Sequence, residues 1–159
     1  MYVLTLRTVI STGVAVAACG YALVRGRGPE RVGAAAYGAN WALTPAVQIY
    51  PLAQLQWGVL GLDLAAAAVL LAIALRANRW WPLLAAAFAL LIPVEHLGYA
   101  IAPRGLARAY FAGEAIWSYA ILLALVAGTA VEAGGARRLS AATSAGFGPA
   151  PRPPGRATP

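Results

Sequence analysis

Lysine is absent from this sequence, and cysteine and histidine occur once each, as Cys19 and His96. A single cysteine excludes an intramolecular disulfide and the CxxC class of metal site. With one histidine, a metal site would have to rely on carboxylate oxygens. The P-loop, GxGxxG and HExxH motifs are missing as well, so the standard signatures of nucleotide-binding and hydrolytic enzymes are absent. We therefore expect a protein without catalytic residues and without a cofactor.

Charge is also scarce. Charged residues make up 11% of the chain, against about 25% in soluble domains. Hydrophobic residues make up 61%, and the mean hydropathy is +0.69. The net charge of +7 comes from arginines that separate apolar runs and form no basic face, which argues against a nucleic-acid partner. This composition predicts an integral membrane protein whose main partners are membrane lipids.

Five apolar segments approach the roughly 20 residues that a helix needs to cross a bilayer. The fold class that they predict is all-α, a polytopic membrane helix bundle with spans at about 8–24, 32–50, 57–75, 82–102 and 110–131. The second segment is the weakest, because it contains Asn40, Thr44, Pro45 and Gln48. Residues 25–31 and 103–109 are expected to form loops. Trp80 and Trp81 are expected in the aromatic belt at the membrane surface.

The arginines predict the orientation. With five spans, nine arginines fall on one side of the membrane and three on the other, and the positive-inside rule places the nine in the cytoplasm. The nine are Arg25, Arg27, Arg31, Arg76, Arg79, Arg137, Arg138, Arg152 and Arg156. The expected location is the cell inner membrane, multi-pass, with the N-terminus outside. Residues 1–133 form the bundle in this interpretation, and residues 134–159, rich in Gly, Pro and Arg, form a disordered cytoplasmic tail.

A stretch from residue 40 to residue 119 carries several short motifs: Asn40-Trp41, Gln56-Trp57-Gly58-Val59-Leu60, Asp63-Leu64, Arg79-Trp80-Trp81-Pro82-Leu83 with Arg76 before it, His96-Leu97 and Ile116-Trp117-Ser118-Tyr119. In these motifs the chain resembles a family of small, uncharacterised bacterial multi-pass membrane proteins. The resemblance covers about half of the chain. It implies a membrane topology, and because the family has no assigned activity it implies no catalytic residues.

Ionisable groups inside a membrane cost roughly 2.5–3.5 kcal/mol each, so their positions are informative. At 1.5 Å per residue, Asp63 lies about 9 Å below the outer end of its helix. Glu95 and His96 reach a similar depth on the next helix, and Glu114 lies about 6 Å below Tyr110 on the last. The sequence therefore predicts that three carboxylates and the only histidine gather in the outer third of the membrane. We expect His96, more than Glu95, to point inward.

The second segment adds a polar stripe to this cluster. Tyr37, Asn40, Trp41, Thr44 and Gln48 recur at spacings of three and four residues and share one helix face. That face is expected to point into the bundle, with Gln48 at the depth of the cluster. Tyr99 follows His96 by three residues and stands beside it, and Ser118 follows Glu114 by four.

Each polar feature has a structural alternative. Asp63 and His96 can form a neutralising pair, and the stripe can serve only for hydrogen bonds between helices. A functional interpretation is a proton or small-solute relay. A weaker one is a metal site of Asp63, His96 and Glu114. The segment around Cys19 resembles a lipobox, which would make the cysteine a lipidation site, whereas the alternative is a small residue within the first helix.

Two functions of different classes therefore stand at this point. The first is a non-enzymatic accessory or structural subunit, held to other membrane subunits or to copies of itself by Ala- and Gly-rich helix faces. The second is a proton-coupled small-solute transporter or relay. A dry, fully paired cluster favours the first, and a cavity that opens onto Asp63 and His96 favours the second.

Overall fold

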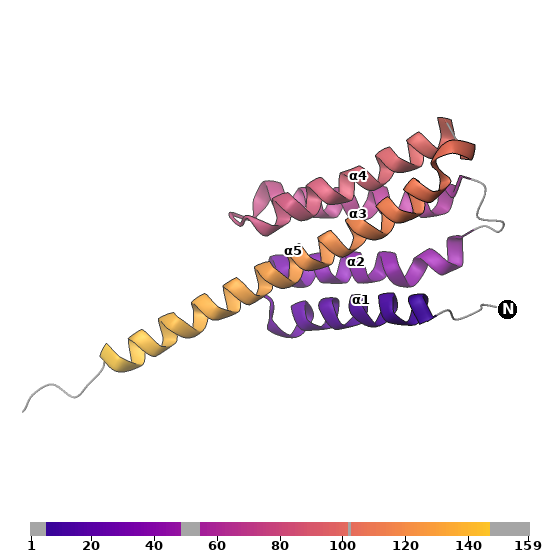
Figure 1. Ribbon diagram of the computed structural model, residues 1–159. Coiled ribbons are helices and arrows are strands. Elements are labelled where there is room, and N and C mark those ends of the chain that lie inside the picture. Colours follow the sequence, from indigo (N-terminus) through magenta and orange to yellow (C-terminus); the bar gives the residue numbers. More distant parts are fainter. Residues whose placement is uncertain (1–5, 49–54, 102, 147–159) are drawn as a thin grey trace, which may run out of the picture.

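The computed structural model describes residues 6–48, 55–101 and 103–146, and in this part of the chain every element is an α-helix. The helices are α1 (Leu6–Arg25), α2 (Gly28–Val47), α3 (Trp57–Arg76), α4 (Trp81–Ile101) and α5 (Pro103–Gly146). They lie side by side and alternate in direction along the bundle, and α5 extends well beyond the other four at one end (Figure 1). The predicted all-α helix bundle is confirmed.

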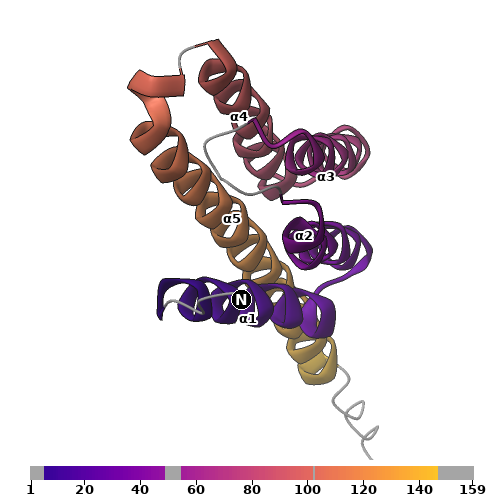
Figure 2. The same ribbon diagram turned by 90° about the vertical axis from the view of Figure 1, so that its right-hand side faces the viewer.

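The order of contacts follows the chain, with one exception. Each helix packs against the next, and α5 crosses back to contact α1 and α2 as well as α4. Seen along the bundle, α5 runs diagonally between the α3–α4 pair and α1 (Figure 2). The short α1–α2 and α3–α4 connections lie at the same end of the bundle, which is the end where α5 protrudes (Figure 1).

Alanines make up much of the interior beside a few large side chains such as Trp81 and Leu70, whereas many large apolar side chains face outward. Alanines at spacings of three and four residues are buried on α1 and α4, among them Ala15, Ala22 and Ala89. Large aliphatic side chains on the same helices remain exposed, for example Leu23 on α1 and Leu90, Leu97 and Ile101 on α4. In a membrane bundle small residues let the backbones approach, and large apolar residues meet lipid. This distribution is that of a bundle whose outer solvent is hydrocarbon.

Four of the five helices are long and apolar enough to cross a membrane. They are α1, in the segment Thr8–Arg25, the whole of α3, the whole of α4, and α5, in the segment Ala112–Gly135. These four predicted spans agree with the structure in type and position. The second predicted span, 32–50, corresponds to α2, which packs against α1 and α3 but carries Glu30, Arg31 and a polar stripe. By composition it does not rank with the other four. The neighbouring helices cover Glu30 and Asn40, whereas Arg31 is exposed.

Three predicted boundaries were wrong. Residues 28–31 are helical, because Pro29 fits the first turn of α2 and the carboxylate of Glu30 accepts the N–H of Arg27. The predicted loop at 103–109 belongs to α5. The predicted disordered tail does not begin at residue 134, since α5 continues as a helix to Gly146 through the first half of that segment. Alanines between 136 and 142 favour that continuation, and residues 147–159 lie outside the described part.

Candidate functional site

A buried carboxylate on α3 is the centre of the predicted polar cluster. Asp63 is 7% exposed, and its Oδ1 accepts a hydrogen bond of 3.0 Å from Nδ2 of Asn40 on α2. Its Oδ2 lies 3.9 Å from Nε2 of His96 on α4 and has no hydrogen-bond partner. His96 is fully buried. Three helices thus meet at Asp63, and the predicted approach of Asp63 and His96 is confirmed.

The second ring nitrogen of His96 constrains where a proton sits in this pair. Nδ1 lies 3.1 Å from the carbonyl oxygen of Ile92, one turn earlier on α4. A carbonyl oxygen only accepts hydrogen bonds, so this contact assigns a proton to Nδ1. In a neutral imidazole Nε2 then carries a lone pair, which faces the Oδ2 lone pairs of Asp63. Two facing acceptors repel, and one additional proton held between them turns the repulsion into an attraction.

A cavity of about 640 Å³ lies beside this pair. Side chains from α1, α2, α3 and α5 form its wall, and Asp63 and Asn40 reach it from α3 and α2. Glu114 and Ser118 on α5 line the same space. Asn40 is 8% exposed, and its Oδ1 has no hydrogen-bond partner. Asn40 and Asp63 thus line the cavity, and each has one buried oxygen, Oδ1 and Oδ2 respectively, whose hydrogen-bonding capacity is not used within the described structure.

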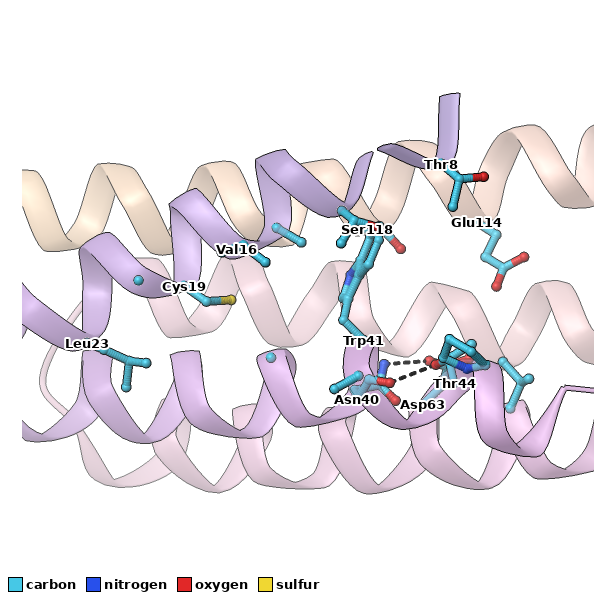
Figure 3. A pocket seen from close by; sticks show the side chains of 17 residues that line it. Thr8, Val16, Cys19, Leu23, Asn40, Trp41, Thr44, Asp63, Glu114 and Ser118 are labelled. Atoms are coloured by element: carbon cyan, nitrogen blue, oxygen red, sulfur yellow. Dashed lines mark hydrogen bonds between the residues drawn. The ribbon is translucent and has the colours of Figure 1, made fainter. Parts of the chain in front are cut away.

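The cavity has a polar end and an apolar end (Figure 3). Glu114, Thr8, Thr44 and Asp63 gather toward one end, where Glu114 enters from α5 on the opposite side from Asp63. Cys19 and Leu23 follow α1 toward the other end, with Val16 nearer the middle. Among the described lining residues the only side chains with a formal charge are Asp63 and Glu114. The polar end is therefore electronegative, and the rest of the wall is mostly hydrocarbon.

Glu95 turns away from the cavity toward α5, as expected if only one of Glu95 and His96 points inward. Its Oε1 accepts a hydrogen bond of 2.7 Å from Nε1 of Trp117, and the carboxylate lies against the backbone of Gly113. The indole of Trp117 also stacks on Phe88, with ring centroids 6.0 Å apart. Glu95 therefore joins α4 to α5 and does not belong to the cavity wall.

The polar stripe of α2 does face the bundle, as predicted. Tyr37 and Asn40 are buried, and the hydroxyl of Tyr37 donates to the carbonyl oxygen of Ser118 at 3.5 Å. Trp41 and Thr44 line the cavity. Gln48 is partly buried at the C-terminal cap of α2, and Tyr99 is buried one turn from His96 on α4; neither belongs to the described cavity wall.

The structure also bears on the metal-site and lipidation hypotheses. Among the described residues, no three of the His, Cys, Asp and Glu side chains are placed to hold a metal ion, so the metal site of Asp63, His96 and Glu114 does not form. The reason is geometric, since Glu114 enters the cavity from the side opposite Asp63 (Figure 3). Cys19 lies within an unbroken α1, is 6% exposed and lines the cavity. This position agrees with the alternative to lipidation, in which Cys19 is a small residue within the first helix.

A second buried acid, which the sequence did not single out, lies at the opposite end of the bundle. Glu30 is fully buried, and its Oε1 accepts a hydrogen bond of 2.9 Å from Nε1 of Trp81. Its Oε2 accepts the backbone N–H of Arg27 at 2.9 Å. The guanidinium of Arg79 lies 3.6 Å from Glu30 and forms an ion pair with Glu132 of α5. We call Glu30, Arg79, Trp81 and Glu132 the loop-end network.

Trp81 corrects the aromatic-belt prediction. It is 1% exposed and fills a gap that two glycines leave: an added Cβ at Gly33 would lie 2.9 Å from Cη2 of the indole, and one at Gly128 would lie 2.6 Å from Cβ of Trp81. Of the two residues Trp80 and Trp81, Trp80 is exposed and Trp81 is not. The sequence did contain a signal for the Glu30–Arg79 contact. The alternating topology puts the start of α2, with Glu30, and the α3–α4 connection, with Arg79, at the same end of the bundle, where opposite charges attract.

Comparison of the chain with protein-family models, with curated proteins and with solved structures gave no match. The resemblance to small bacterial multi-pass membrane proteins therefore stays a prediction, and the function has to be argued from the site itself.

Proposed function

We propose that this protein is a proton-coupled transporter or relay for a small solute, and that Asp63 and His96 hold the coupled proton. The observation that supports this function best is the incomplete pairing of Asp63 beside a cavity. One oxygen of its carboxylate is bonded by Asn40, and the other faces His96 at 3.9 Å without a hydrogen bond. A cluster that served only to neutralise its own charges would be closed and fully paired.

The steps follow from the acceptor geometry. With a proton between Oδ2 of Asp63 and Nε2 of His96, the pair is neutral or internally compensated and tolerates its buried position. Loss of the proton leaves an Asp63 carboxylate that keeps its hydrogen bond from Asn40 and lines the cavity. That state attracts a cation or a hydrogen-bond donor from the cavity. Binding of the solute and release of the proton are thereby linked through one carboxylate, which is the requirement for coupling.

The accessory-subunit alternative has less support. It depends on small-residue faces that are available to partners, whereas several alanines of α1, α3 and α4, among them Ala15, Ala66 and Ala85, are buried inside the bundle. Exposed small residues do remain: open space surrounds Gly13, Gly20, Gly61 and Gly98, and Ala35, Ala39, Ala42 and Ala46 of α2 are exposed. These faces do not distinguish the two functions, and the unpaired oxygen of Asp63 is what favours the relay.

The orientation belongs to the same proposal. The α1–α2 and α3–α4 connections, with Arg27 and Arg79, lie at one end of the bundle together with the protruding part of α5 (Figure 1). We infer that the protein lies in the cell inner membrane, that this end faces the cytoplasm, and that the cavity's polar end faces outward. Reporter fusions at positions 27, 54, 78, 105 and 135 are expected to alternate in, out, in, out and in. A periplasmic position 27 contradicts the orientation.

The function is tested in liposomes that contain the purified full chain and an internal pH dye. Under an imposed membrane potential, wild-type protein is expected to carry protons, and Asp63→Asn is expected to abolish the flux while the protein stays folded. His96→Ala should lower the flux and shift its pH profile. Glu95→Gln is the matched control, since Gln keeps the acceptor for Trp117 and lies outside the cavity. Equal proton flux in wild type and Asp63→Asn overturns the proposal.

A further inference from the structure

We propose that the cavity between α1, α2, α3 and α5 binds an amphipathic organic cation, with its charged group between Asp63 and Glu114 and its apolar part along α1. This assignment names the substrate class of the proposed transporter and in that sense rests on the proposed function. The binding site itself is argued from the shape, charge and lining of the cavity, and it is testable without transport.

The charge of the ligand follows from the polar end. Asp63 and Glu114 approach this end from α3 and α5, and no described lining residue carries a positive charge. An anion placed there would meet two carboxylates in a medium of low dielectric constant, where like charges repel strongly. A cation gains from both. Asn40, a buried polar residue whose Oδ1 has no hydrogen-bond partner, lines the same cavity.

The apolar part follows from the rest of the wall. Away from the carboxylates the cavity is lined by Val16, Cys19, Leu23 and Trp41. From Thr8 to Leu23 the α1 wall spans about 22 Å at 1.5 Å per residue, so the site is elongated. A small hydrated ion would leave this surface uncovered, whereas a ligand with a hydrocarbon body buries it. Trp41 also offers an aromatic face to a cationic group.

The size limits the ligand to a small molecule. A volume of about 640 Å³ lies within the range of roughly 300–1,000 Å³ that is common for drug-sized ligands. A lipophilic monovalent cation such as tetraphenylphosphonium fits this class, and tetraphenylborate offers almost the same shape with the opposite charge. The pair therefore separates recognition of charge from recognition of apolar bulk.

The binding experiment uses the full chain in detergent and titrates it with each of the two probes. Tetraphenylphosphonium is expected to bind saturably with one site per chain, to bind less tightly as the pH falls, and to lose at least tenfold in affinity in Asp63→Asn and in Glu114→Gln. Glu95→Gln should bind like wild type, because its carboxylate lies against α5. Equal binding of tetraphenylborate, or unchanged affinity in Asp63→Asn and Glu114→Gln, overturns the assignment and indicates a site for neutral lipid or detergent.

A second measurement needs no substitution. Cys19 is the only cysteine of the chain and lines the cavity, so its reaction with a small thiol reagent reports on occupancy. Tetraphenylphosphonium is expected to slow the labelling at least severalfold, and tetraphenylborate is not. The outcomes also separate the two proposals. Proton flux without cation binding leaves the transporter standing and removes this substrate class. Cation binding without proton flux in liposomes leaves the site standing and removes the coupling.

Discussion

The bundle buries two carboxylates, one near each end, and their surroundings differ in completeness. Glu30 at the loop end accepts two hydrogen bonds of 2.9 Å, from Trp81 and from the N–H of Arg27, and the guanidinium of Arg79 lies 3.6 Å away. Asp63 accepts one hydrogen bond, from Asn40, and its second oxygen has none. Packed side chains surround Glu30, whereas Asp63 lines a cavity.

The difference shows what each acid does for the protein. A buried charge with a full set of donors fixes helices in place, and removing it leaves those donors unsatisfied. A buried charge with a free oxygen adds little to stability and keeps affinity for a proton or a ligand. Glu30 is therefore expected to stabilise the arrangement of α2, α4 and α5, and Asp63 is the residue to which we assign the proposed function. Four substitutions test this contrast, in order of decreasing loss of stability.

The largest loss is expected for Glu30→Ala. It leaves Nε1 of Trp81 and the N–H of Arg27 without their acceptor and removes one of the two carboxylates near Arg79. Breaking such a buried pair costs about 3–5 kcal/mol. Unfolding in mixed micelles of increasing denaturing-detergent fraction measures this loss. Glu132→Ala, whose side chain is about one-third exposed, should cost no more than about 1 kcal/mol. Equal costs for the two would mean that burial at Glu30 contributes nothing.

Gly128→Ala is expected to cost less, about 1–3 kcal/mol. The added Cβ would overlap the base of the Trp81 side chain, which is buried on all sides and has no room to move. Gly134→Ala on the same helix is the matched control, because open space surrounds that position. The control should be neutral or slightly stabilising, by up to about 1 kcal/mol, since Ala is the better helix former. The same micelle titration, followed by Trp fluorescence, compares the two variants.

Trp117→Phe tests whether Glu95, which lies outside the cavity wall, takes part in transport. It removes the hydrogen bond to Glu95 but keeps an aromatic ring stacked on Phe88. Because Glu95 is partly exposed, the loss should be about 1 kcal/mol. Cation binding and proton flux should stay within twofold of wild type. A strong loss of flux would show that Glu95 belongs to the transport route and that the assignment of the cavity wall is too narrow.

The smallest change in stability is expected for Asp63→Asn, within about 1 kcal/mol of wild type, because a neutral isostere replaces a charge that the fold only partly satisfies. The same substitution is expected to abolish proton flux. Glu30→Gln provides the comparison, since it keeps the shape at the loop end and should leave flux measurable. Should Asp63→Asn unfold the protein as readily as Glu30→Ala, Asp63 would be a structural group and the contrast between the two ends would fail.

The sequence predictions that are wrong share one cause. Arginine, glycine and proline predict loops at residues 28–31 and 103–109, yet Pro29 and Pro103 fit the first turns of helices. The frequency of tryptophan at membrane surfaces predicts that Trp81 lies there. Its burial depends on Gly33 and Gly128, which come from α2 and α5. Local composition does not contain that information, because the three positions are distant in the chain.

The sequence by itself determined the helical bundle, four of its membrane-type helices and the level along the helices at which Asp63 and His96 lie. Helix length and the sign of hydropathy follow from local residues, and a rise of 1.5 Å per residue turns position into distance along a helix. Only the tertiary structure decided which polar groups meet. The rotation of α4 turns His96 toward Asp63 and Glu95 toward Trp117. The crossing of α5 over α1 and α2 brings Glu114 to the cavity, because helix rotation and crossing are set by packing between distant segments.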